Sequence, residues 1–308
     1  MKNRTVDIIK LLLGLVIIVF LLLKFDLYEV GKTIISVPFT FFIITLLVYT
    51  LVNIIGTYKI WILFLGFAKK LNFVKLFKDY SLSWGLGLFV PGKIGEFSLV
   101  YFLKRKGIDL GLSSALVLFD KISAFVVLSL AAVTGFVLYA SEADTIMLMG
   151  ALLIIYVVIF FFVFSDFGRG LIKKFIFKSK SEKFKGFSKS LFYLIRKKKL
   201  VIVFALLLGA LKWLVNSALV FILLRYFGQP VGFLSVFFIT SAVTIVSFIP
   251  ITFNGIGLKE SGAIVLFSLF GIKESAVLAT FLYLFIMAVI LGLIHILYSF
   301  KEIKAIKF

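Results

Sequence analysis

The chain has 308 residues, of which 62% are apolar, and its mean hydropathy is +1.19. Several apolar runs approach the roughly 20 residues that cross ~30 Å of hydrocarbon, so the composition predicts an all-α, polytopic integral membrane protein. The formal net charge is +20. In such a protein, Lys and Arg in the loops report orientation and contact with anionic lipid, not nucleic-acid binding. The chain has no cysteine, which excludes disulfides and thiolate metal sites.

Six apolar segments are long enough to be full spans. They are 8–23, 34–60, 112–138, 146–164, 200–224 and 275–300. The first follows a basic start, but no small-residue cleavage site comes after it, so we expect an uncleaved helix. Four shorter apolar pieces flank two breaks in the apolar pattern. They are 80–90 with 97–103, and 233–249 with 261–270.

The two breaks look like copies of one unit. The first is 91–96, followed by Gly107-Ile108, and the second is 250–260, followed by Gly271-Ile272. In each, a proline and two glycines precede a glutamate, and the Gly-Ile pair begins eleven residues after that glutamate. Because neither flanking piece can span a bilayer alone, we interpret each unit as a re-entrant helical hairpin.

Orientation follows from the tendency of basic loops to remain cytoplasmic. With re-entrant hairpins, both termini and three basic regions fall on the inside. These regions are the loop from Lys59 to Lys78, Lys104 to Lys106, and the segment 166–199. The two hairpins then open to opposite sides. The chain is therefore predicted to be one transmembrane domain, 1–308, with an inverted repeat of about 34–138 and 200–300, a design common in transporters.

The glutamate of each unit is a candidate site residue. Glu96 and Glu260 could bind a proton or cation, or orient a lysine that grips phosphate. Alternatively, they cap a helix or pair locally with Lys93 and Lys259. Ionisable groups inside a membrane are costly and usually functional, which favours the first interpretation.

The glycines of the units permit irregular backbone, and their amides could hold an anionic group as helix ends do. They are Gly92, Gly95, Gly255 and Gly257. Asn254 precedes the second glycine pair and could cap a helix or donate to a substrate oxygen.

Four other residues carry charge or polarity within apolar runs. Asp120 and Lys121 lie in the middle of 112–138 and form either a substrate contact or a structural pair within the helix. Lys212 lies deep in 200–224, where an acid on another helix could balance it. His295 is interpreted as a packing residue.

The basic segment 166–199 interleaves aromatic and leucine residues with lysines. This pattern favours an amphipathic helix on the inner leaflet, which could gather anionic lipids. The alternative is a solvated loop that only sets orientation.

Enzymatic chemistry has little support in the sequence. There is no nucleotide-binding loop, metal-ligand cluster or nucleophile elbow, and the chain has one histidine. We therefore predict no catalytic residue, cofactor or metal. A membrane-embedded transferase, with Glu or Asp acting as a base, is the alternative.

The two units, together with Leu103-Lys104-Arg105 and Asp120-Lys121, resemble the paired signatures of the lysylphosphatidylglycerol synthase transmembrane family, also called flippase-like. The resemblance implies a prokaryotic cell-membrane protein that moves an anionic or amphiphilic lipid between leaflets. The headgroup would be of the phosphatidylglycerol, aminoacylated or polyprenyl-phosphate type. Glu96 and Glu260 would line a central cavity, and phosphate would contact Lys93, Arg105, Lys121 and Lys259.

The resemblance has two departures. The family often has arginine after the aspartate, whereas Lys121 keeps the charge but lacks the bidentate fork for phosphate. The family's aminoacyl transferase domain would follow the membrane region, and this chain ends at Phe308, so we expect a free-standing member. Its expected partners are membrane lipids. A second alternative to transport is that the chain is a membrane partner subunit of a separate synthase or glycosyltransferase.

Overall fold

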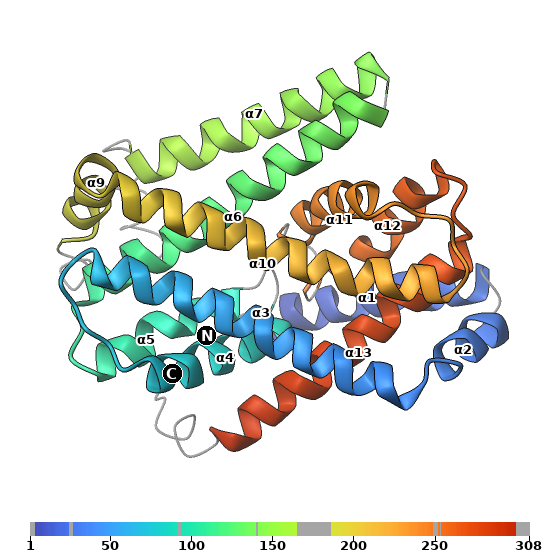
Figure 1. The fold of residues 1–308 in the computed structure, drawn as a ribbon, viewed down its shortest axis with the longest axis horizontal. Helices are drawn as coiled ribbons and strands as arrows, with labels where there is room; N and C mark the ends of the chain where they lie inside the picture. Colours follow the sequence, from blue (N-terminus) through green and yellow to red (C-terminus); the bar gives the residue numbers. More distant parts are fainter. Residues whose placement is uncertain are drawn as a thin grey trace.

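The computed structural model describes residues 4–24, 27–90, 94–139, 141–164, 186–248, 252 and 254–299 (Figure 1). These residues are helical with short connections, and no strand occurs among them. The predicted all-α class is confirmed.

The helices follow one another in the order of their labels in Figure 1. Their bounds are α1 (Arg4–Lys24), α2 (Leu27–Ile35), α3 (Phe39–Leu65), α4 (Phe73–Leu88), the 3₁₀ helix η1 (Ile94–Phe97), α5 (Ser98–Arg105), α6 (Leu110–Tyr139), α7 (Glu142–Phe164), α9 (Phe187–Lys197), α10 (Lys199–Tyr226), α11 (Phe233–Ser247), α12 (Leu258–Ser268) and α13 (Glu274–Tyr298).

Four described helices, α3, α6, α10 and α13, are long and apolar enough to cross a membrane. This confirms the polytopic membrane class. Helices α1 and α7, at 21 and 23 residues, have the length expected of the other two predicted spans. The count of six spans and the re-entrant placement of the short helices stay predictions.

The outward surfaces of the long helices agree with a lipid environment. Leu47 of α3 is 64% exposed and Leu207 of α10 is 59% exposed. Large apolar side chains in such number on an outer surface mark contact with a membrane or a partner.

The two breaks fold the chain back on itself. Helix α4 contacts both η1 and α5, and α11 contacts α12. At the first break, a Cβ on Gly95 would lie 2.4 Å from the Leu86 carbonyl oxygen, so only glycine allows this close approach. At the second, Gly255 and Gly257 have φ of +77° and +82°, a region that glycine adopts without strain.

The packing of the helices is reciprocal. Helix α4 packs against α13, and α11 packs against α6, while α3 and α10 run side by side. These are the contacts that two halves related by a twofold axis would make. They agree with the inverted repeat, whose boundaries stay a prediction.

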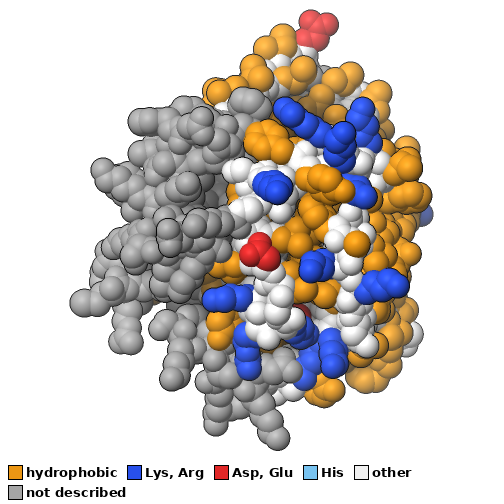
Figure 2. Space-filling view, turned by 90° about the vertical axis from the view of Figure 1, so that its left-hand side faces the viewer, with side chains coloured by type: hydrophobic (Ala, Val, Ile, Leu, Met, Phe, Trp, Pro, Cys, Tyr) orange, Lys and Arg blue, Asp and Glu red, His pale blue; other side chains and the backbone are white. Residues whose placement is uncertain are grey.

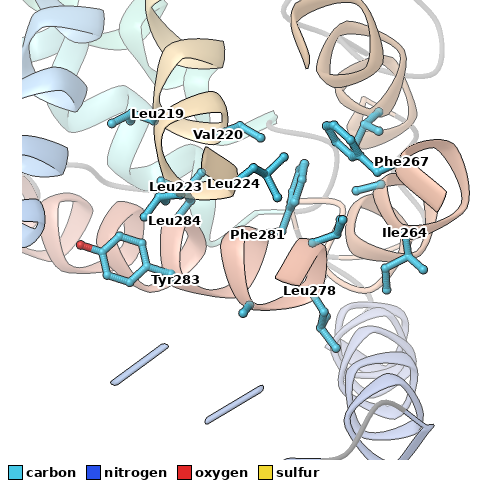
Figure 3. Close-up of a cluster of buried hydrophobic side chains, with 14 of the residues drawn as sticks. Leu219, Val220, Leu223, Leu224, Ile264, Phe267, Leu278, Phe281, Tyr283 and Leu284 are labelled. Carbon is cyan, nitrogen blue, oxygen red and sulfur yellow. The ribbon is translucent and has the colours of Figure 1, made fainter. Parts of the chain in front are cut away.

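Buried apolar side chains join the helices within and between the halves. In Figure 3, Leu223 and Leu224 of α10 lie beside Phe281 and Leu284 of α13, within one cluster that also includes Phe267 of α12. Close packing of this kind holds helices together in a bilayer, where lipid tails are as apolar as leucine. The helices of this cluster are therefore closely packed against one another.

Part of the basic segment 166–199, namely 166–185, lies outside the described residues. The remainder forms α9, whose Leu191 and Leu194 are buried and which contacts α6. The apolar face of α9 thus packs on the bundle. Figure 2 shows Lys and Arg side chains gathered at this end of the molecule, where the last turns of α5 and α9 are basic.

Candidate functional site

A cavity of about 110 Å³ lies among the helices of both predicted repeats. Its walls include side chains from α3, α4, η1 and α6 on one side and from α10 to α13 on the other. Six of the described lining residues are charged. They are Lys59, Glu96, Asp120, Lys121, Lys212 and Lys259.

Four of these charges form a continuous chain of ion pairs. The Lys59 Nζ lies 2.9 Å from the Asp120 Oδ1 and donates to the Asp120 backbone carbonyl at 3.2 Å. The second oxygen of Asp120 lies 3.1 Å from the Lys121 Nζ, and Lys121 also pairs with Glu96. The side chains of Lys59 and Asp120 are 2% and 7% exposed, so this ion pair is buried and each charge offsets part of the desolvation cost of the other.

The ion-pair chain links three elements of the first repeat. Lys59 comes from α3, Asp120 and Lys121 come from α6, and Glu96 comes from η1. Gly209 of α10 lies against the lysine, since a Cβ there would be in ordinary van der Waals contact with the Lys59 Nζ at 3.5 Å. The break in the helix therefore positions Glu96 where Lys121 can reach it.

Lys212 of α10 sits in an aromatic setting. Its Nζ donates to the Tyr80 hydroxyl at 2.9 Å and lies 5.5 Å and 5.7 Å from the ring centroids of Tyr80 and Trp213. A Cβ on Gly56 would lie 2.2 Å from the Tyr80 hydroxyl oxygen, so the glycine makes the space that Tyr80 occupies. In the described part of the chain, no carboxylate forms a salt bridge with Lys212.

The lysine and the glutamate of the second break point in different directions. Lys259 lines the cavity with its Nζ 5.3 Å from the Phe281 ring centroid. Glu260 is 3% exposed, is not part of the cavity wall, and accepts a hydrogen bond from the Gly257 N–H at 2.7 Å. Its carboxylate caps the start of α12, and the Gly257 amide is thereby engaged within the protein.

The other predicted site residues divide between the cavity and the surface. Asn254 lines the cavity with φ of +49°. Arg105 is exposed at the end of α5 and does not line the cavity. Gly95 serves close packing against α4. Lys93 and Gly92 lie outside the described residues.

Sequence reasoning missed one member of the ion-pair chain. Lys59 was predicted to belong to a cytoplasmic loop, but it lies within α3 and is buried. The signal was its position between apolar residues in a helix that continues to Leu65. Lys212 was noted as a deep lysine, and the structure adds its place on the cavity wall and its contact with Tyr80.

The fold and the cavity define a class: a polytopic, all-helical membrane protein that encloses a small charged chamber. Within this class, the chain belongs to the lysylphosphatidylglycerol synthase TM region family, whose sequence model matches residues 8–295. The comparison with curated proteins found no match.

Proposed function

We propose that this protein moves an anionic or amphiphilic lipid between the leaflets of a prokaryotic cell membrane. The observation that carries the proposal is the cavity lined by six charged side chains inside a bundle of apolar helices. Family membership supports the membrane setting and a role in lipid handling.

The energetic cost of placing charged side chains within membrane segments argues for a transport role. Ionisable residues within membrane segments are expensive and mark substrate or ion pathways in most cases. A headgroup could cross through the cavity while its acyl or prenyl chains remain in the hydrocarbon. Walls from two oppositely oriented halves would allow the cavity to open to each side in turn.

Glu96 is the residue that we assign to linking movement of the first break to the ion pairs of the cavity. It lies on the short helix after the first break and holds Lys121 through an ion pair. Movement of the break would shift this contact and with it the position of the Lys121 ammonium group.

The test is leaflet exchange of fluorescent lipids by the purified protein in liposomes. We expect Glu96→Gln to slow exchange about tenfold or more, because the change removes the carboxylate charge that pairs with Lys121, and 1.4 kcal/mol corresponds to about tenfold in rate. The control is Glu142→Gln, a change at an exposed position of α7, which should leave exchange unchanged.

Glu260→Gln gives a second comparison. A glutamine oxygen can still accept from the Gly257 N–H, so we expect exchange to stay within about twofold of the wild type. Absence of exchange for every lipid, with folded and inserted wild-type protein, would contradict the proposal. Chemical conversion of a lipid by that protein would support the transferase alternative instead.

A further inference from the structure

The charges around the cavity do not balance. Lys59 and Lys121 pair with Asp120 and Glu96, which leaves Lys212 and Lys259 without a salt bridge among the residues that the structure describes. Among the described residues, the wall thus has four lysines and two acids, a formal excess of two positive charges that an ionised Glu260 beside Lys259 reduces to one. Glu260, next to Lys259, lies behind the wall with its carboxylate turned to the Gly257 amide.

Both lysines keep donors for a ligand. An ammonium group has three N–H donors, and Lys212 uses one of them on the Tyr80 hydroxyl. Lys259 lies over the Phe281 ring, where a cation–π contact occupies no donor in a linear hydrogen bond. Asn216 and Asn254 add neutral amide groups to the same wall. These groups suit an anion that accepts several hydrogen bonds.

The volume restricts the size of that anion. Sites for drug-sized molecules have volumes of roughly 300–1,000 Å³, several times the 110 Å³ of this cavity. A phosphate with little attached to it matches a cavity of this size. A headgroup that carries glycerol and an aminoacyl group does not.

We infer that the transported headgroup is a phosphate monoester at the end of a lipid, bound by Lys212 and Lys259. This inference rests on the proposed transport function and names its substrate class. A phosphate monoester carries about −1.5 to −2 charges at neutral pH, opposite in sign to the excess of lysines on the wall. Lysyl-phosphatidylglycerol, which has a positively charged and larger headgroup, fails on both charge and size.

Two kinds of lipid share this chemistry, phosphatidic acid and a polyprenyl monophosphate. The experiment measures leaflet exchange of each in phosphatidylcholine liposomes, beside phosphatidylglycerol and lysyl-phosphatidylglycerol. We expect at least one monoester to exchange about tenfold faster than either of the other two lipids. The faster of the two monoesters identifies the lipid class.

Variants test the two lysines directly. Lys212→Gln and Lys259→Gln should each slow monoester exchange about tenfold, while Lys32→Gln, at an exposed position of α2, should not. Lys212→Arg keeps the charge and should retain most of the exchange. It also keeps the assignment testable if the glutamine variant does not fold.

Each contrary outcome has a distinct meaning. Equal or faster exchange of phosphatidylglycerol or lysyl-phosphatidylglycerol would overturn the monoester assignment and leave lipid transport standing. Normal monoester exchange by folded Lys212→Gln and Lys259→Gln would overturn the residue assignment. Uptake of radiolabelled inorganic phosphate into the liposomes without lipid exchange would overturn both the lipid headgroup and the proposed function.

Discussion

Lys59 and Asp120 are separated by 61 residues in the chain and meet in the interior at 2.9 Å. Removing one member of a buried ion pair leaves the other charge without compensation, which is more damaging than removing both. Asp120 retains Lys121 in that event, whereas Lys59 has Asp120 as its acidic partner within the described residues. The pair therefore has a structural role that can be separated from transport.

We predict that Lys59→Met lowers the free energy of unfolding by about 3 kcal/mol, at the low end of the range for a broken buried pair, because Lys121 still compensates Asp120. The double variant Lys59→Met, Asp120→Leu should be less destabilised than Lys59→Met alone. Unfolding of the purified variants in detergent measures both. Strictly additive losses would show that the pair is not coupled.

At the scale of elements, the helix bounds depend on capping and close approach as well as on apolar runs. The piece expected at 80–90 is part of α4, which begins at Phe73 because the Asn72 side chain accepts from the Lys75 N–H. Likewise, α2 was not expected as a separate helix before α3. Helix boundaries of this kind leave only weak signals in an apolar sequence.

Substitution of Gly95 tests the close backbone approach at the first break. In Gly95→Ala, the new Cβ would meet the Leu86 carbonyl carbon and oxygen and the Gly87 nitrogen, which are backbone atoms and cannot rotate away. We expect a loss of about 1–3 kcal/mol, as for overpacked cores. The matched control is Gly262→Ala in α12, where a Cβ meets nothing within 4 Å and should add about 0.5–1 kcal/mol of stability. Equal stability of the two variants would refute the close-approach argument.

At the scale of the whole molecule, α6 separates the turn that precedes it from the turn that follows it. Its 30 residues extend about 45 Å at 1.5 Å per residue, more than the thickness of the hydrocarbon core. The exposed basic turn at Lys104 and the exposed Glu142 therefore lie on opposite sides of the membrane if α6 spans it. The reciprocal packing of α4 on α13 and α11 on α6 agrees with two oppositely oriented halves.

Because the chain has no cysteine, single thiols can report topology without prior mutation. We predict that Lys104→Cys is labelled by a membrane-impermeant maleimide only from the cytoplasmic side, and Glu142→Cys only from the outside. Intact cells and inverted vesicles provide the two sides. Labelling of Lys104→Cys only from the outside, with Glu142→Cys labelled only from the cytoplasmic side, would remove the re-entrant assignment and the inverted repeat together.

The sequence by itself determined the membrane class, the all-α fold, the two breaks and the family, since all four depend on local composition and on short motifs. It also identified Glu96, Asp120, Lys121, Asn254 and Lys259, which the structure gathers at one cavity. These residues are visible locally because charge and polarity within or beside apolar runs are costly.

Only the tertiary structure decided which charges meet. Lys59 joins Asp120, Lys212 reaches Tyr80, and Glu260 turns to its own helix start because of how separate helices pack and turn. The direction of a side chain and the identity of its partner on another helix are properties of packing. For that reason, the balance of charge in the cavity, and with it the inferred phosphate ligand, could not be derived from the sequence.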